Sequence, residues 1–115
     1  MSAAAESRPV IVLTTLGAQA DGPAFARVLV GEGLAACVNV LPVMTSVYRW
    51  KGRIEEEREQ QIVIKTTRDC LVALETRFHE LHPYETPEFL VVAVSAGSPA
   101  YLEWLAESVG ASGHS

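Results

Sequence analysis

Two histidines three positions apart, His79 and His82, are the side chains best suited to binding a metal ion. This spacing places both rings on one side of a helix, provided that the helix extends as far as His82. Glu80 and Glu85 lie nearby, and imidazole nitrogen with carboxylate oxygen is a ligand set that a borderline divalent ion accepts. The alternative is that His79 is solvated and that His82 caps the last carbonyls of the helix.

Two cysteines are further candidates for chemistry: Cys37 as a nucleophile or metal ligand, and Cys70 as a thiol in the first turn of a helix. Cys37 occurs in an apolar, strand-like segment, where a free cysteine acts either as a small hydrophobic residue or as a soft metal ligand. No spacing forces the two cysteines together, so we expect both thiols to be free. Free thiols are typical of a reducing compartment, and we therefore expect a cytoplasmic protein.

An acidic run follows two aromatic residues in the middle of the chain. Residues 55–59 read Glu-Glu-Glu-Arg-Glu, which is typical of a solvated strand face. The functional alternative for this run is pairing between subunits or weak attraction of cations. Tyr48 and Trp50 offer large amphipathic surfaces of the kind that subunit interfaces favour. We interpret Trp50, Tyr101 and Trp104 as packing surfaces rather than as a ligand cage.

Composition excludes several classes of function. The 115-residue chain is 49% hydrophobic and has 9 Lys and Arg against 14 Asp and Glu, for a net charge of −5. Nucleic-acid binding depends on Lys and Arg, and a membrane helix needs an apolar run of about 18–20 residues, so neither partner is expected. The motifs GxSxG, GxGxxG, CxxC, HExxH and the P-loop are absent from the sequence, and we expect a protein that is not an enzyme.

Hydrophobic periodicity predicts the elements that position these residues. Strands are expected over residues 10–15, 35–50, 54–66 and 89–94, and the first and last of them read as central strands covered on both faces. Helices are expected to begin at Asp21-Gly22-Pro23, after Thr67 (ending before Pro83) and at Ser98-Pro99.

The order β-α-β-β-α-β predicts an α+β fold, a ferredoxin-like split β-α-β sandwich, with an extra C-terminal helix. Residues 9–109 are expected to form this single domain, because domains usually have about 100–150 residues. Residues 1–8 and 110–115 are small and polar, and we expect both ends to be flexible.

The two middle strands are joined by the short turn Lys51-Gly52-Arg53 and therefore predict a long hairpin. At about 3.3 Å per residue, an arm of this length spans about 50 Å, whereas a domain of this size has a diameter of about 35 Å. The arms should overhang the body and leave backbone groups unpaired. We expect a second copy of the chain to complete them, and the alternative is a bend at Pro42 that folds the arm back.

Five segments occur in an order that resembles the CutA family, the divalent-cation tolerance proteins. They are AACVNVLP (35–42), SVYRWKG (46–52), IKTT (64–67), HPYETPE (82–88) and AYLEW (100–104). The resemblance covers nearly the whole domain. It implies a ferredoxin-like protomer in a homotrimer similar to the PII signalling proteins, a role in tolerance to copper and other divalent ions, and no catalytic activity.

The resemblance also implies metal ligands. The family's copper ligands are a cysteine late in the first strand and two consecutive histidines before the Pro-Tyr motif. Thr14 and Leu81 occupy two of these three positions, so His82 is the only copper-ligand position that matches. Cys37 matches a separate family position, the cysteine in the second strand. We therefore expect His82, Cys37 and Glu85 to bind Cu²⁺ or another divalent cation, which is not held tightly.

In the trimer that the resemblance implies, the hairpin over residues 43–61 crosses onto a neighbouring subunit. Tyr48, Trp50 and Tyr84 are then expected to pack between subunits. The alternative function is a PII-like scaffold or signalling trimer that binds a protein or a small molecule in the clefts between subunits.

Overall fold

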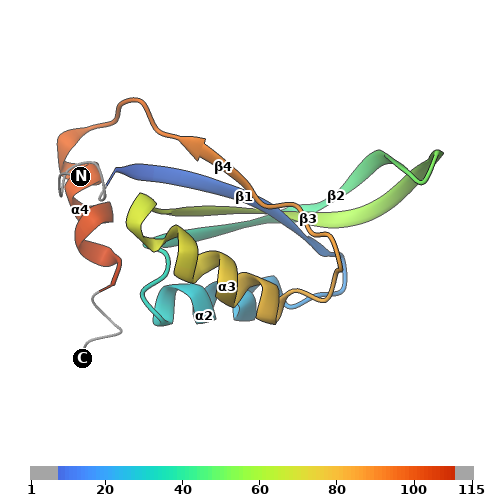
Figure 1. Ribbon diagram of the computed structural model, residues 1–115, viewed down its shortest axis with the longest axis horizontal. Helices are drawn as coiled ribbons and strands as arrows, with labels where there is room; N and C mark the ends of the chain where they lie inside the picture. The colour runs from blue at the N-terminus through green and yellow to red at the C-terminus, as the bar shows by residue number, and fades with distance from the viewer. Residues whose placement is uncertain (1–7, 111–115) are drawn as a thin grey trace.

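Antiparallel strands form one sheet in the computed structural model, which describes residues 8–110 (Figure 1). The strands are β1 (Pro9–Gly17), β2 (Cys37–Trp50), β3 (Arg53–Thr67) and β4 (Leu90–Ala93), in the order β2-β3-β1-β4. This order confirms the ferredoxin-like sandwich predicted from the sequence. Apart from Arg8 and Gly110, the ends that were expected to be flexible lie outside the described residues.

Helices α2 (Gly22–Gly31) and α3 (Leu71–Leu81) lie on one face of the sheet, and a 3₁₀ turn (Arg68–Cys70) leads into α3 (Figure 1). Helix α4 (Pro99–Ser108) lies at the end of the sheet that is farther from the hairpin tip. Asp21 and Ser98 cap their helices as predicted, since they accept backbone N–H groups of α2 and α4. The predicted cap at Thr67 is wrong, because its hydroxyl donates to the carboxylate of Asp69 and makes no cap hydrogen bond. No helix within residues 8–110 is long and apolar enough to span a membrane.

The hydrophobic core lies between the sheet and helices α2 and α3. Alternate residues of β1 and β3 point toward the helices, and those of the core are fully buried: Val10, Val12, Ile62 and Ile64. Leu29, Leu74 and Phe78 are the fully buried helical side chains that pack against them. Burying each such side chain contributes about 1.5–3 kcal/mol, so this face stabilises the domain. The opposite sheet face, with Ile11 and Leu13, is only half-buried.

The β2–β3 hairpin projects beyond the helices and sets the longest dimension of the molecule (Figure 1). The extents are 45 × 29 × 24 Å, and the radius of gyration is 15.0 Å, above the value of about 13 Å typical of this length. Lys51 and Gly52 form the turn with φ of 51° and 78°, as a two-residue hairpin turn requires. A register shift between Val40 and Val43 marks an irregularity of the β2–β3 pairing at Pro42, but the arm does not fold back there (Figure 1). The predicted overhang is therefore confirmed.

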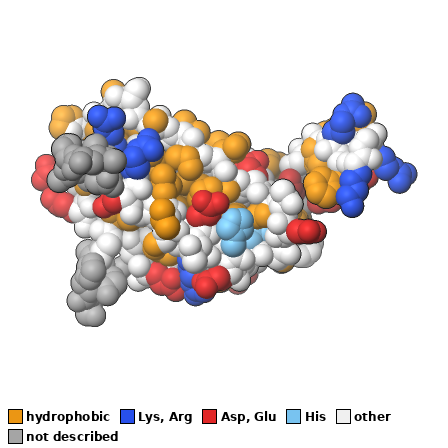
Figure 2. Space-filling model, in the orientation of Figure 1, with side chains coloured by type: hydrophobic (Ala, Val, Ile, Leu, Met, Phe, Trp, Pro, Cys, Tyr) orange, Lys and Arg blue, Asp and Glu red, His pale blue; other side chains and the backbone are white. Residues whose placement is uncertain are grey.

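The last strand differs from the prediction. Residues 89–94 were expected to form a central strand, but β4 pairs only with β1 and lies at the edge of the sheet. Leu90, Val91 and Val92 are 56%, 43% and 46% exposed in the single chain. A continuous apolar run predicts burial but does not distinguish a strand covered within its own chain from an edge strand. Figure 2 shows hydrophobic side chains on the surface over this part of the molecule.

Candidate functional site

His82 lies at the corner between α3 and the loop that leads to β4. Its backbone is extended (φ −87°, ψ 130°), so the residue ends the helix rather than continuing it. The ring Nε2–H donates to the carbonyl oxygen of Thr15 at 2.7 Å, and Nδ1 accepts the backbone N–H of Tyr84 at 3.1 Å. Both ring nitrogens are thus engaged, and the side chain is only 7% exposed.

The expectation that both histidines share a helix face is wrong. His79 lies on the exposed side of α3, with Nε2 3.4 Å from a carboxylate oxygen of Glu75. The ring of His82 instead packs between aromatic rings, with its centroid 5.1 Å from that of Phe78 and 4.8 Å from that of Tyr84. The backbone N–H of His82 donates to the carbonyl of Phe78, as the capping alternative predicted.

The other predicted metal ligands are not brought together with His82. Cys37 begins β2 and pairs with Lys65, which in turn pairs with Ile11, whereas His82 binds the opposite end of β1 at Thr15. Glu85 lies on the loop after His82 and is exposed. Within the described residues, no group of three or more His, Cys, Asp or Glu side chains is arranged to hold a metal ion. Both cysteines are free, as predicted.

Thr14 and Leu81, which occupy family ligand positions, contact the core. The hydroxyl of Thr14 is fully buried on the helix side of β1 and has no hydrogen-bond partner in the described part of the chain. An unsatisfied buried hydroxyl costs about 1–3 kcal/mol. Leu81 packs against the hydrophobic core. Neither position therefore offers a strong metal ligand beside His82.

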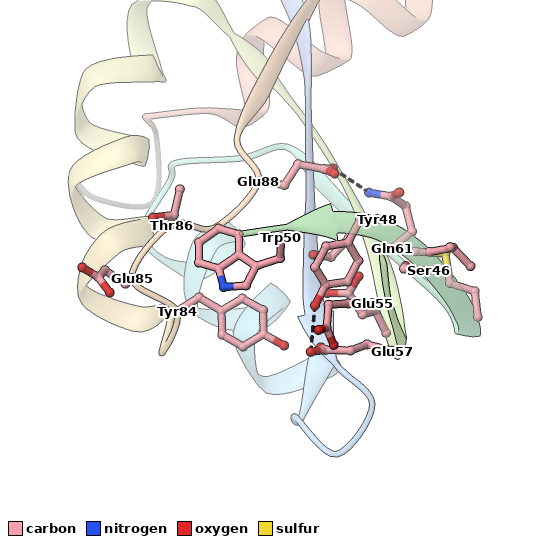
Figure 3. A pocket seen from close by; sticks show the side chains of 14 residues that line it. Ser46, Tyr48, Trp50, Glu55, Glu57, Gln61, Tyr84, Glu85, Thr86 and Glu88 are labelled. Atoms are coloured by element: carbon pink, nitrogen blue, oxygen red, sulfur yellow. Dashed lines mark hydrogen bonds between the residues drawn. The ribbon is translucent and has the colours of Figure 1, made fainter. Parts of the chain in front are cut away.

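A groove of about 740 Å³ lies between the β2–β3 hairpin and the loop over residues 84–88 (Figure 3). We call it the acidic groove. Five glutamates line it: Glu55, Glu57, Glu59, Glu85 and Glu88. Three aromatic residues line it as well: Tyr48, Trp50 and Tyr84. The lining contains no Lys, Arg or His.

The hairpin register arranges these side chains in two adjacent rows on one face of the hairpin. Tyr48 pairs with Glu55, Ser46 with Glu57, and Met44 with Glu59. Because successive side chains of a strand point to opposite faces, alternate residues of β2 and of β3 share the face that lines the groove. The β3 row is acidic, whereas the β2 row is aromatic and apolar near its ends.

Hydrogen bonds fix the position of several lining groups. The Tyr48 hydroxyl donates to Glu57 at 2.8 Å, and this bond, together with desolvation and the charges of Glu57, Glu55 and Glu59, raises the pKa of Tyr48 to about 12. Burial, with the nearby charges of Glu59 and Glu57, also raises the pKa of Tyr84. Both hydroxyls therefore stay protonated at neutral pH.

Glu59 is the most buried carboxylate of the groove, with 8% of its surface exposed. It accepts a hydrogen bond from the Thr15 hydroxyl at 3.1 Å. On the neighbouring position of the same face, the Gln61 amide donates to Glu88 at 3.3 Å and thereby links β3 to the loop that closes the groove. The groove is thus formed by three separate parts of the chain: β1, the β2–β3 hairpin and the loop over residues 84–88.

The acidic run was evident in the sequence, and Tyr84 was grouped with Tyr48 and Trp50, but as residues that pack between subunits. Neither Glu88 nor a groove within one chain was predicted. A two-residue turn fixes the register and places even-numbered residues of β2 opposite odd-numbered residues of β3, but the turn was predicted over residues 51–53. The approach of the loop over residues 84–88 depends on the tertiary fold and had no sequence signal.

Comparison with known proteins gives consistent matches over the whole domain. Residues 10–108 match the family described as CutA1 divalent ion tolerance protein. The divalent-cation tolerance protein CutA of Thermus thermophilus is 40% identical over 100 residues, which cover 87% of this chain and 97% of that protein. CutA of Yersinia pestis is 42% identical over 108 residues, covering 94% of this chain and 91% of that protein.

Solved structures agree with the sequence matches. The divalent cation tolerance protein (Cut A1) from Thermus thermophilus has a TM-score of 0.85 and 39% identity, and covers 89% of this chain and 99% of that chain. The PII-like protein CutA from Nostoc sp. PCC 7120 has a TM-score of 0.80 and 36% identity, with 87% and 96% covered. At these identities, the matches show family membership as well as the fold.

Proposed function

This chain belongs to the CutA1 divalent ion tolerance family, and from that premise we propose that it is a non-enzymatic homotrimer that binds divalent cations weakly. The observation that carries the proposal is the match over residues 10–108, which reaches every element of the fold. Cu²⁺ is the expected ion, because imidazole suits it and it binds most tightly in the divalent series. The two free cysteines support a location in the reducing cytoplasm.

His82 is the proposed metal ligand, through Nδ1. A histidine ligand usually donates its other ring N–H to a carbonyl, and Nε2–H of His82 already donates to Thr15 in this way. The ion must replace the Tyr84 N–H at Nδ1, which makes binding weak. Glu85, exposed on the same loop, is proposed to add an oxygen ligand. Cys37, at the other end of the sheet, contributes in this proposal only if a neighbouring subunit brings its thiol close to the ion.

Isothermal titration with Cu²⁺ tests the metal proposal. The wild type should bind with measurable heat, and His82→Gln should lose at least tenfold in affinity. His79→Gln is the matched control, because it removes an exposed imidazole from the same helix region and should leave the affinity unchanged. Equal affinity in His82→Gln and wild type would remove His82 from the site. Absence of heat in all three proteins would favour the scaffold alternative.

The trimer is supported by apolar surface that the single chain leaves uncovered. Ile54 near the hairpin tip is 72% exposed, Trp50 is exposed on the other face of the hairpin, and the edge strand β4 exposes its aliphatic side chains. Strands β2 and β4 are the two edges of the sheet, and their free backbone groups favour pairing with another chain. Of the three residues expected to pack between subunits, Trp50 lies nearest the hairpin tip, and all three line the acidic groove.

Light scattering tests the assembly. We expect a mass of three times the 12.4 kDa of one chain at micromolar concentration. Ile54→Glu should shift the mass toward that of a single chain, because it places a charge in the proposed interface. Val72→Glu is the matched control, since Val72 is 82% exposed on α3, away from the hairpin, and its substitution should leave the mass unchanged. A monomer mass for the wild type would refute the proposed trimer.

A further inference from the structure

The tip of the β2–β3 hairpin carries three basic side chains: Arg49, Lys51 and Arg53. All three are exposed, and Figure 2 shows Lys and Arg side chains at this end of the molecule. The ion pairs found among residues 8–110 use Arg77 and His79 of α3 as their cations and involve none of the three. Within the described chain, the tip thus presents positive charges that no carboxylate neutralises.

The arm that carries this tip has only two strands. Strand β1 pairs with β3 as far as Gly17 opposite Glu59, and beyond that point the ladder joins β2 and β3 alone, up to Trp50 opposite Arg53. A two-stranded hairpin without a further packing partner is marginally stable in water. The arm nevertheless projects from the body (Figure 1). Its extended form therefore favours contact with another molecule.

The acidic groove has the charge that complements the tip. Its lining contains five glutamates and no Lys, Arg or His, whereas Glu32 and Glu80 on the helix side already pair with Arg77. The rings of Tyr48 and Tyr84 in the groove are 37% and 39% exposed. Guanidinium and ammonium groups pack on such ring faces as well as pairing with carboxylates. The groove therefore fits a segment that carries several cations.

The hairpin tip does not occupy the groove of its own chain. Trp50 lines the groove, but none of the three basic residues of the tip does. The ladder runs without a register shift from Val43 opposite Gln60 to Trp50 opposite Arg53, so the arm has no irregularity at which it could fold back. The tip of a second copy of this chain is then an occupant of matching charge that the protein itself provides.

We propose that the hairpin tip of one copy docks in the acidic groove of the next, where Arg49, Lys51 and Arg53 pair with the glutamates of the lining. This inference rests on the proposed trimer and names the contact that joins its successive subunits. Each chain carries one tip and one groove, so the contact is head-to-tail, and a head-to-tail contact forms a closed ring when the rotation between copies closes. The residues that were expected to pack between subunits all line this groove.

Cross-linking of the full chain with a carbodiimide, which joins an amine directly to a carboxylate, tests the proposal. Unlabelled and isotope-labelled chains are unfolded together in urea and refolded, so that a cross-linked peptide pair of mixed label comes from two copies. We expect mixed-label pairs between Lys51 and glutamates of the acidic groove, and fewer of them at high salt, which screens exposed charges. Lys51→Arg keeps the charge but removes the amine and should abolish these pairs. Lys65→Arg, which replaces the other lysine of the chain, is the matched control and should retain them.

Charge reversal at the tip provides a second measurement. Arg49→Glu/Arg53→Glu should raise the concentration at which the assembly dissociates by about tenfold, as expected for the loss of several exposed ion pairs. Light scattering over a dilution series measures this concentration. Arg27→Glu/Arg68→Glu is the matched control, because it changes the charge by the same amount at two exposed positions outside the hairpin. It should shift the dissociation by less than about twofold.

The outcomes separate this contact from the trimer itself. A monomer mass for the wild type would refute both. A trimer mass in which the cross-links of Lys51 are absent, lie within one chain, or reach only Glu103 and Glu107 of α4 would overturn the tip-to-groove contact and leave the trimer in place. An equal shift in dissociation for the tip variant and its control would also overturn the contact, because it would indicate general charge repulsion between copies.

Discussion

Replacement of His82 should destabilise the domain far more than replacement of its neighbour His79. The imidazole of His82 connects α3, the loop after it and β1 through two hydrogen bonds, at 2.7 Å to Thr15 and 3.1 Å to Tyr84. In His82→Ala, the carbonyl of Thr15 and the N–H of Tyr84 both lose their ring partner. A cavity also opens between the rings of Phe78 and Tyr84.

The magnitude follows from these contacts. A net hydrogen bond contributes about 1 kcal/mol, and an unsatisfied buried group costs about 1–3 kcal/mol. Removal of a large buried side chain adds a cavity term, and such substitutions commonly cost about 2–5 kcal/mol in total. We therefore expect His82→Ala to lower the free energy of unfolding by about 3 kcal/mol. His82→Phe, which restores the volume but not the hydrogen bonds, should recover about half of that loss.

Urea unfolding measures the effect, with all variants at one protein concentration because the stability of an oligomer depends on concentration. His79→Ala is the control, and it should change the free energy of unfolding by less than about 0.5 kcal/mol, since the side chain is half exposed. A loss below about 1 kcal/mol in His82→Ala, or a loss equal to that of the control, would refute the role of His82 in joining α3 to β1.

Three further outcomes are expected. Gly22→Ala should cost about 1–3 kcal/mol, because a Cβ there would lie 2.6 Å from a methyl carbon of Val40, whereas Gly31→Ala, with open space around it, should be neutral or stabilising in the same urea assay. In a phenolate absorbance titration, Tyr48 should ionise near pH 12, and Glu57→Gln should move its pKa toward 10. In the wild type, the hydrogen bond from Tyr48 to Glu57 should stabilise the folded chain below pH 10, and this stabilisation should be lost as the pH rises toward 12. Thiol titration of denatured, non-reduced protein should find both cysteines free, and a count near zero would contradict this.

The sequence alone determined the order of elements and the long hairpin. Helix starts at Asp21 and Ser98 were predictable because capping depends on residues within one turn of each other. The hairpin itself was predictable for the same reason, but its register was not. The turn was predicted over residues 51–53, whereas it consists of Lys51 and Gly52, and Arg53 already pairs with Trp50. Local spacing therefore identifies an element more reliably than it fixes the residue at which the element turns.

Two sequence predictions failed because they concern contacts over long range. The apolar run over residues 89–94 predicted a covered strand, but coverage depends on which elements lie beside it, and β4 has a neighbour on one side only. His82 was grouped with His79 by helical spacing, yet the helix ends at Leu81 and the ring turns toward Thr15, 67 positions earlier in the chain. Periodicity carries no information about such a partner.

What the sequence by itself determined is the chemistry available to this protein: an acidic run, aromatic residues near the hairpin tip, two free thiols and a family pattern that runs through the whole domain. Only the tertiary structure decided which of these groups meet. It buried the imidazole of His82 in hydrogen bonds, placed Cys37 at the other end of the sheet, and folded the loop over residues 84–88 against the hairpin to form the acidic groove. The physical reason is that side-chain type is a local property, whereas a site depends on distances between segments that the chain brings together only when the core between sheet and helices has formed.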